Sequence, residues 1–255
     1  MCLINFHFQE HANYKLIIAA NRDESYTRPT ACAQFWEDDA SILAGRDLLQ
    51  GGTWLGITKN GRFAALTNYR DPSLSVKGCF SRGDIVRRFL SGEMEPITFI
   101  NELAGNRALY DGFNVLVGNC DQIFHYNNIL NEKKIIFPGT HSLSNHTLNT
   151  PWPKVEKGKK RLKEYVQNNQ QKVELNPLFD IIADHTIAAD QNLPDTGVGL
   201  SMERALSPLF IKMPGYGTRS STILLIDKRN NVTFAERVFI EGEFSEEKRF
   251  NFKII

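Results

Sequence analysis

The sequence predicts an α+β protein in which antiparallel sheets are covered by helices. Short apolar runs rich in strand-forming residues occur in pairs separated by turn-forming residues, which is the pattern of β-hairpins. Helix-like segments come in blocks between these pairs and do not follow every strand, as they would in a parallel sheet. Residues 1–255 show no internal repeat and no linker, so we expect one domain.

The first predicted element is a hairpin formed by residues 1–8 and 14–20. Both segments are apolar, rich in strand formers and too short for ordinary helices. The polar segment between them predicts a turn centred between His11 and Ala12.

If the two strands pair symmetrically about this turn, a polar cluster lies at the open end of the hairpin. This symmetry pairs Cys2 with Asn21 and leaves Arg22 and Asp23 just beyond, beside the amino terminus. A thiol, an amine, a cation and a carboxylate would then meet at the mouth of an otherwise apolar hairpin.

This cluster suggests N-terminal nucleophile catalysis. Aminopeptidases usually remove an initiator Met when the next residue is as small as Cys, so Cys2 would carry both a thiol and an α-amine. Their ordinary pKa values of about 8.5 and about 7.7–8.0 let the amine accept the thiol proton near neutral pH. We expect Arg22 to lower the thiol pKa further and Asp23 to orient the amine. The alternative is that Cys2 is merely a small residue that follows Met1.

The remaining elements are predicted in chain order. Apolar runs bounded by turn formers predict strands at 33–36, 41–44, 53–58, 62–68, 112–118, 122–126, 133–137, 217–227 and 232–239. Helical patterns predict helices at 81–91, 96–103, 151–168 and 176–183. We expect residues 188–214 to be rich in loops and the charged tail after Gly242 to be frayed.

Two further features have ordinary explanations. The pair Gly51-Gly52 lacks the spacing of a phosphate-binding loop and precedes a predicted strand, so we expect no phosphate site there. The basic run from Lys154 to Lys163 is interpreted as the solvated face of a helix and not as a nucleic-acid patch.

The composition is that of an ordinary globular protein. A net charge of +1 gives no reason to expect nucleic acid or an anionic membrane as a partner. The apolar run 16–20 is far too short for a signal-peptide core or a membrane span. No C-x-x-C spacing occurs among the cysteines, which are Cys2, Cys32, Cys79 and Cys120. We therefore expect a cytoplasmic protein in a reducing compartment, without a transmembrane segment, a metal or a cofactor.

Asn68, Asn145 and Arg219 stand at the ends of three later predicted strands. A thiolate that attacks an amide carbonyl develops a negative oxygen, which the side-chain amide of Asn68 or Asn145 is suited to bind. Arg219 is suited to hold a charged group of the substrate. The alternative for each is turn chemistry, because Asn is common at strand ends.

A Cys–His dyad is a rival assignment. The candidate bases are His141 and His146, which flank Asn145. The N-terminal placement of Cys2 makes a separate base unnecessary.

Seven motifs carry a resemblance to a known family. They are Met1-Cys2, Asn21-Arg22-Asp23-Glu24, Gly51-Gly52-Thr53-Trp54-Leu55-Gly56, Thr67-Asn68-Tyr69-Arg70, Leu143-Ser144-Asn145, Pro151-Trp152-Pro153-Lys154-Val155 and Thr218-Arg219-Ser220-Ser221-Thr222. Together and in this order they resemble the NRDE family, whose eukaryotic members are called Transport and Golgi organization protein 2. The resemblance covers almost the whole chain. A mild departure is Gly118-Asn119, where the family pattern has Gly-Asp.

The NRDE family resembles a branch of the N-terminal nucleophile (Ntn) hydrolases, near the cysteine group that includes penicillin V acylase and bile salt hydrolase. This resemblance implies a four-layer αββα sandwich of two antiparallel sheets and hydrolysis of a non-peptide amide bond. The Arg and Asp of those acylases are separated by two residues and are adjacent here, which leaves open which side chain plays which part. The site residues would be Cys2, Arg22, Asp23, Asn145 and Arg219, with Asn68 as a further oxyanion candidate.

Two functions are therefore expected. The first is an amidohydrolase that cleaves the C–N bond of a small acyl amide, with Cys2 as nucleophile after removal of Met1. The alternative is a non-catalytic carrier or chaperone for an apolar ligand such as haem or a lipid, because the eukaryotic relatives are linked to secretory and Golgi organisation. Aromatic residues near glycines, such as Trp54 and Phe113, fit the carrier. The intact set of polar site residues favours the enzyme, since a carrier has no need of it.

Overall fold

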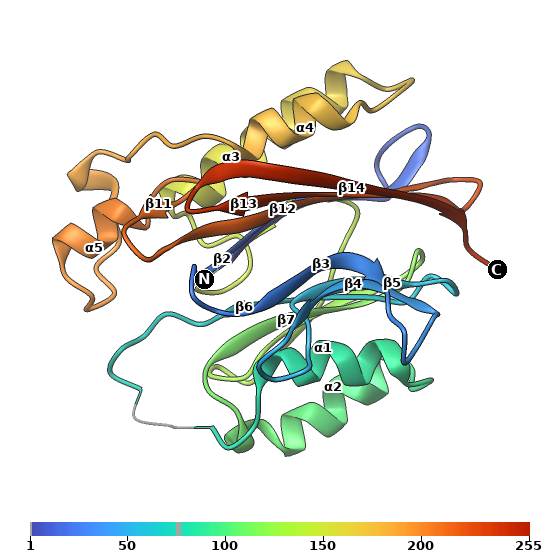
Figure 1. Cartoon of the computed structure of the whole chain (residues 1–255), viewed down its shortest axis with the longest axis horizontal. Helices are drawn as coiled ribbons and strands as arrows, with labels where there is room; N and C mark the ends of the chain where they lie inside the picture. The colour runs from blue at the N-terminus through green and yellow to red at the C-terminus, as the bar shows by residue number, and fades with distance from the viewer. Residues whose placement is uncertain (1, 75–77) are drawn as a thin grey trace.

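The computed structural model describes residues 2–74 and 78–255 as two antiparallel sheets that face each other (Figure 1). The predicted removal of Met1 concerns a residue outside this described part.

The first sheet has the strand order β10-β1-β2-β12-β13-β14, with β11 paired to β12. Its strands are β1 (Cys2–Phe8), β2 (Tyr14–Ser25), β10 (Gly139–Leu143), β11 (Lys212–Met213), β12 (Tyr216–Asp227), β13 (Asn231–Ile240) and β14 (Glu243–Lys253). The second sheet follows the chain in the order β3-β4-β5-β6-β7-β8-β9. Its strands are β3 (Thr30–Phe35), β4 (Ile42–Asp47), β5 (Leu55–Thr58), β6 (Phe63–Asn68), β7 (Phe113–Gly118), β8 (Ile123–Asn127) and β9 (Glu132–Ile135).

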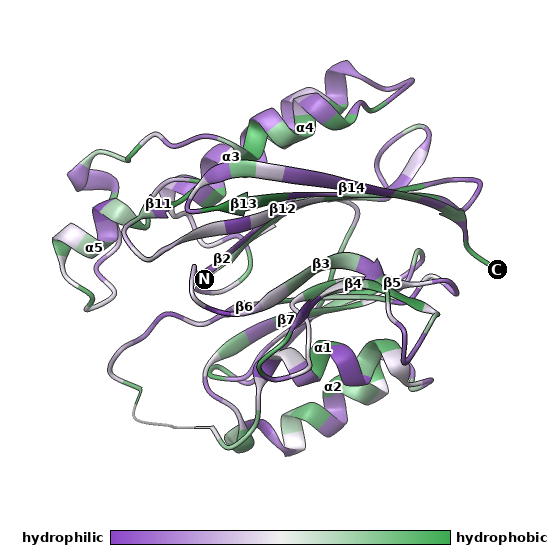
Figure 2. Ribbon diagram, viewed as in Figure 1, coloured by the Kyte–Doolittle hydropathy of each residue, from purple (hydrophilic) through white to green (hydrophobic). Residues whose placement is uncertain are grey.

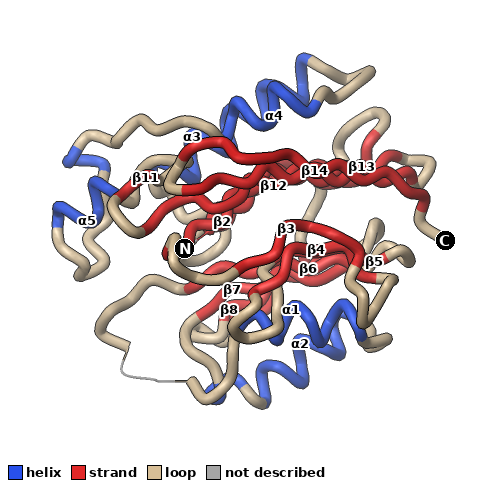
Figure 3. The backbone as a smooth tube through the Cα atoms, viewed as in Figure 1, coloured by secondary structure: helices blue, strands red, loops and turns tan. Residues whose placement is uncertain are grey.

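Helices cover the outer face of each sheet, so the predicted four-layer αββα sandwich is confirmed (Figure 3). Helices α3 and α4 lie on the first sheet, and α1 and α2 lie on the second. The helices are α1 (Arg82–Ser91), α2 (Pro96–Gly105), α3 (Pro153–Asn168), α4 (Leu175–Ile182) and α5 (Leu200–Ala205), with short 3-10 turns at Arg107–Leu109 and Asp190–Asn192. In the described residues, no helix is long and apolar enough to span a bilayer.

The apolar side chains of the strands alternate between two layers, as the two-residue period of a strand requires. Ile4 and Phe6 of β1 point between the sheets and pack in one cluster with Phe63 of the second sheet. Ile17 of β2 points the other way and packs with Leu162 of α3. The sandwich therefore buries both faces of β1 and β2, which is why these strands read as continuous apolar runs.

Helix α3 approaches the first sheet closely because Gly158 faces β1. A Cβ atom on Gly158 would lie 2.4 Å from Oδ1 of the buried Asn5. Most of the basic run in this helix is exposed or half-buried, as predicted. Lys154 is the exception, at 2% exposed, because the first turn of α3 points inward at the end of the sheet.

The predicted register of the first hairpin is wrong by one residue, since Cys2 pairs with Arg22 and not with Asn21. The turn contains an odd number of residues and is held by His11, whose Nδ1 accepts hydrogen bonds from the N–H groups of Asn13 and Tyr14. Gln9 adopts a positive φ of 52° at the start of this turn. The observed turn is centred on Ala12, and the predicted centre between His11 and Ala12 shifts every pair by one residue.

The predicted frayed tail is ordered. The tail after Gly242 forms β14, which pairs with β13 from Asn231↔Lys253 to Ile240↔Glu243. Charged residues along β14 face solvent at the edge of the sheet (Figure 2), where they discourage pairing with another chain. Residues 188–214 are rich in loops, as predicted, and contain the short elements α5 and β11.

Candidate active site

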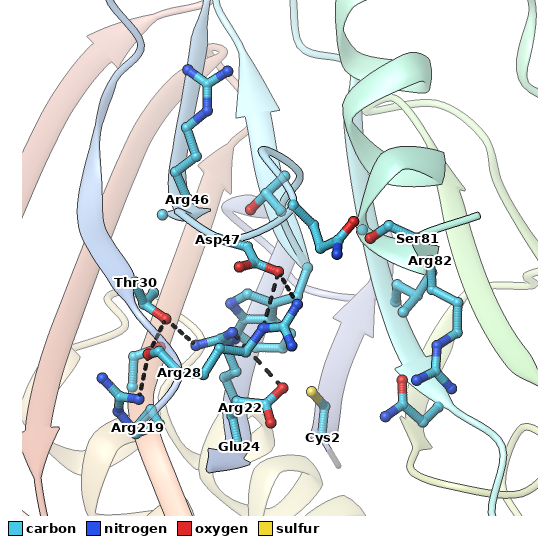
Figure 4. A pocket seen from close by; sticks show the side chains of 18 of the residues that line it. Cys2, Arg22, Glu24, Arg28, Thr30, Arg46, Asp47, Ser81, Arg82 and Arg219 are labelled. Atoms are coloured by element: carbon cyan, nitrogen blue, oxygen red, sulfur yellow. Dashed lines mark hydrogen bonds and ion pairs between the residues drawn. The ribbon is translucent and has the colours of Figure 1, made fainter. Parts of the chain in front are cut away.

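The open end of the first hairpin forms one wall of a cavity of about 360 Å³ between the two sheets (Figure 4). Cys2 and Arg22 are Cα partners in neighbouring strands, so their side chains lie on the same face of the sheet. Both line the cavity, together with Glu24, which lies two residues after Arg22 and therefore on the same face. The Arg22 guanidinium donates to Thr30 Oγ1 at 3.1 Å and lies 4.0 Å from the Glu24 carboxylate.

The Cys2 thiol is buried, and burial raises its pKa above the ordinary value. The negative charge of Asp23 raises the pKa further, whereas the Arg22 guanidinium and the backbone N–H of Asp23 lower it. The expected effect of Arg22 therefore has the right sign, but burial outweighs it. The resting thiol is neutral near pH 7 and needs a base to become a nucleophile.

Asp23 lies on the opposite face of the sheet from Arg22 and does not line the cavity. Its carboxylate accepts a 2.7 Å hydrogen bond from Thr218 Oγ1. Burial raises the pKa of this carboxyl, and the positive charges of Lys154 and Arg70 act against that rise. Asp23 therefore faces the buried charges beneath the sheet, while its backbone stays beside Cys2.

Arg219 occupies a bulge where β12 pairs with β2. The register passes from Thr218↔Asp23 directly to Ser220↔Arg22, so Arg219 has no partner residue in β2. Its side chain lines the cavity. The Nη1 group donates to the carbonyl oxygens of residues 25, 26 and 28 at 2.8–3.2 Å and so holds the segment between β2 and β3.

The two candidate oxyanion residues occupy different positions. Asn68 lines the cavity at the end of β6. Asn145 is fully buried behind the wall, where its Nδ2 donates to the Asn68 carbonyl oxygen at 3.0 Å. The Ser144 hydroxyl lies 3.1 Å from both Asn145 Oδ1 and the Cys2 carbonyl oxygen. Asn145 is thus linked to the backbone of Cys2, while Asn68 presents its side chain to the cavity.

The rival histidines are placed away from the cavity. His141 stacks on Phe6, with ring centroids 5.2 Å apart, and its Nε2 contacts the Phe137 carbonyl oxygen. His146 contacts Thr150 Oγ1 at 3.1 Å through its Nδ1. Neither lines the cavity in the described part of the chain, so the structure gives no support to a Cys–His dyad.

Several charged residues of the site were not predicted from the sequence. Arg28 pairs with Asp47 on the cavity wall, and Arg82 enters the cavity from the start of α1. Glu236 lies at the wall with 3% of its surface exposed and accepts a 2.7 Å hydrogen bond from the Ala33 N–H. Arg82 lies at the start of a helix that the sequence predicts, but no sequence pattern indicated where its side chain would point.

A second group of charged residues lies beneath the first sheet, on the Asp23 side. Arg70 and Glu203 form a buried ion pair of 2.7 Å. Lys154 lies 3.4 Å from Asn145 Oδ1, and burial lowers the pKa of its ammonium to about 7. Lys154 belongs to one of the family motifs, which could have marked it as a site residue. The basic residues that follow it instead suggested a solvated position.

The described residues contain no group of three or more side chains suited to hold a metal ion. The cysteines are free thiols, namely Cys2, Cys32, Cys79 and Cys120.

Comparison with known proteins gives relatives over nearly the whole chain. The family model for Transport and Golgi organisation 2 matches residues 1–241. The Transport and Golgi organization protein 2 homolog of Homo sapiens is 35% identical over 268 residues, which cover 96% of this chain and 95% of the human one. The Drosophila melanogaster Transport and Golgi organization protein 2 is 27% identical, with 92% and 91% of the two chains covered.

A solved structure has the same architecture. The C2A mutant of the conjugated bile acid hydrolase from Clostridium perfringens superposes with a TM-score of 0.53 at 7% identity, covering 99% of this chain and 97% of that chain. At such low identity the likeness concerns the fold alone, and it agrees with the predicted Ntn-hydrolase sandwich.

Proposed function

The chain belongs to the Transport and Golgi organisation 2 family, and we propose that it is an N-terminal nucleophile hydrolase that cleaves the C–N bond of a small acyl amide. The observation that carries the proposal is the position of the Cys2 thiol on the cavity wall, on the same face as Arg22. The neighbour of like fold is named a hydrolase, and its name records a mutation of a cysteine at position 2. A free thiol is required for this chemistry, and a reducing, cytoplasmic setting would preserve it.

In the first half of the proposed reaction, the amine of Cys2, freed by removal of Met1, accepts the thiol proton. The thiolate attacks the amide carbonyl carbon and forms a C–S bond. The tetrahedral intermediate then collapses, the C–N bond breaks, and the leaving amine takes the proton from the Cys2 ammonium. An acyl-thioester on Cys2 remains.

In the second half, water attacks the thioester carbonyl and gives a proton to the Cys2 amine. The C–S bond breaks, the carboxylic acid leaves, and the thiol regains its proton. One water is consumed for each amide cleaved into an acid and an amine.

The roles of the other residues follow from their positions. Arg22 favours the thiolate, because its charge lowers the thiol pKa. Asn68 is the oxyanion donor that lines the cavity, and Asn145 supports it through the Asn68 carbonyl. Asp23 would hold the Cys2 amine from the face opposite Arg22. Arg219 keeps the segment after β2 in place.

The carrier alternative has weaker support. Both arginines and carboxylates line the cavity wall, among them Arg22, Glu24 and Glu236. An apolar ligand such as haem or a lipid would place apolar surface against these charged groups and remove water from them, which is costly.

The proposal is tested by trapping the acyl-enzyme. The purified chain is first mapped by mass spectrometry to establish that Cys2 is the first residue, because retention of Met1 would remove the proposed base. An acyl lactone should then add one acyl group to Cys2, releasable by neutral hydroxylamine as a thioester. Cys2→Ala should abolish this label, whereas Cys79→Ala, which removes an exposed thiol, should retain it. Undiminished labelling of Cys2→Ala would contradict the proposal.

A further inference from the structure

Among the described residues, five arginines line the cavity wall, and their partners differ. Arg28 and Arg46 are neutralised, because they form ion pairs with Asp47 at 2.5 Å and with Asp38 at 2.6 Å. These two guanidinium groups are held by the protein's own carboxylates and are poorly suited to bind a ligand.

Two other arginines are also committed. Arg219 donates to three backbone carbonyl oxygens. Arg22 donates a hydrogen bond to Thr30 and lies 4.0 Å from the Glu24 carboxylate. The guanidinium groups of both residues are therefore already bound to other parts of the protein.

Arg82 is different from these four. In the described part of the chain its guanidinium makes one hydrogen bond, from Nη1 to the Gly112 carbonyl oxygen at 3.1 Å. The neighbouring carboxylate of Asp111 instead accepts the Gly78 N–H at 2.7 Å. Most of the N–H donors of Arg82 are thus left for a ligand.

The position of Arg82 is fixed by backbone packing. Arg82 is the first residue of α1, and the following Gly83 accepts a 3.1 Å hydrogen bond from the Thr53 N–H. Figure 4 shows the Arg82 side chain on one side of the Cys2 thiol, with Arg22 and Glu24 on the other. A substrate amide at Cys2 would therefore have a cationic fork beside it. Such a fork binds a carboxylate or another oxyanion through two parallel hydrogen bonds.

We infer that Arg82 binds an anionic group of the substrate, so that the cavity takes an acyl amide that carries a carboxylate or a similar oxyanion near the scissile bond. This inference rests on the proposed function for the identity of the reaction. The anion preference of the cavity is independent of turnover.

The test compares two alkylating reagents of nearly equal size, iodoacetate and iodoacetamide, which differ in charge. The rate of each reaction at Cys2 is measured by peptide mapping, and the ratio of the two rates is divided by the ratio for free N-acetylcysteine. Any change in the thiol pKa affects both reagents equally and cancels in this ratio. The native chain should favour iodoacetate, and Arg82→Gln should lower the ratio by about threefold to tenfold.

Two variants serve as controls. Arg82→Lys keeps the charge and should keep most of the preference for iodoacetate. Arg107→Gln removes the same charge from an exposed arginine that does not line the cavity and should leave the ratio unchanged. The native ratio should also fall as salt is added, because ions screen the attraction. An equal ratio in the native chain and Arg82→Gln would overturn the inference.

A binding measurement covers the case in which the buried thiol resists both reagents. With Cys2→Ala protein, which cannot turn over, N-octanoylglycine should raise the melting temperature more than N-octanoylglycinamide, and Arg82→Gln should abolish the difference. Equal shifts, or no shift with either ligand, would overturn the inference. If acyl-thioester forms but no anion preference is found, the inference fails and the hydrolase stands. If the preference is found without an acyl-enzyme, the hydrolase fails and the anion site stands.

Discussion

Cys2 and Arg22 are Cα partners across β1 and β2, and both side chains enter the cavity between the sheets. Asp23 follows Arg22 directly, so its side chain points to the opposite face, toward Thr218. The adjacent Arg and Asp therefore act on different sides of the sheet. The cation faces the thiol, and the carboxylate faces the buried charges beneath the strand.

The first prediction concerns Arg22. Since its charge lowers the pKa of the Cys2 thiol, Arg22→Gln should raise that pKa and reduce the thiolate fraction at neutral pH. Alkylation of Cys2 by iodoacetamide at pH 7 should slow by about threefold to tenfold, as expected for the loss of one neighbouring charge. The rates of the two proteins should converge at high pH, where both thiols are ionised. A rate–pH profile measured by peptide mapping checks this, and an unchanged midpoint would contradict it.

The hairpin shows how far the sequence could predict this site. The apolar runs and the polar end were sufficient to bring Cys2 near Arg22, because both belong to one local hairpin. The register was not predictable from symmetry, because it depends on the side chain of His11 and on the positive φ of Gln9. A slip of one residue exchanges the two faces of a strand, so it decided which of Arg22 and Asp23 faces the cavity.

The sequence was less informative about which distant residues meet at the cavity. Arg82, Glu236 and Cys2 meet at one cavity although they come from α1, β13 and β1. Helix and strand patterns locate such elements along the chain but carry no information on which side chains meet across two sheets. The charged tail was misjudged for a related reason, because β14 gains its order from pairing with β13 and not from an apolar pattern of its own.

The second prediction concerns Glu236. Burial raises the pKa of this carboxyl from 4.5 to about 6, so the folded state disfavours its ionised form. The neutral acid contributes stability that is complete below pH 4.5 and is lost as the pH rises through about 6. The difference between the two values corresponds to about 2 kcal/mol.

Glu236→Gln should therefore raise the free energy of unfolding near neutral pH by up to about 2 kcal/mol, since Gln can still accept the Ala33 N–H. Near pH 4 the variant and the native chain should be equally stable. Urea denaturation at both pH values measures this. A variant that is less stable near neutral pH would show that the ionised carboxylate is favourably paired in the folded protein.

The third prediction concerns the buried pair of Arg70 and Glu203, whose side chains are 7% and 3% exposed. Arg70→Met should cost about 3–5 kcal/mol, because it leaves the Glu203 carboxylate buried without its counter-charge. The double variant Arg70→Met, Glu203→Leu should recover much of this loss. Arg204→Ala, which breaks an exposed pair with Asp190, should cause no measurable change. Equal stabilities for Arg70→Met and the native chain would contradict the prediction.

The last prediction concerns Gly52, which precedes β5 and lies against the backbone at the start of α1. A Cβ atom on Gly52 would lie 2.5 Å from the backbone carbon of Gly83, a contact that only a backbone shift can relieve. Gly52→Ala should therefore destabilise the fold by about 1–3 kcal/mol. It should also displace Arg82, the residue before Gly83, and so reduce the preference of Cys2 for iodoacetate over iodoacetamide. Gly105→Ala is the matched control, because its Cβ would meet nothing within 4 Å at the end of α2. A loss of stability in Gly52→Ala with an unchanged reagent ratio would show that Arg82 is held independently of this contact.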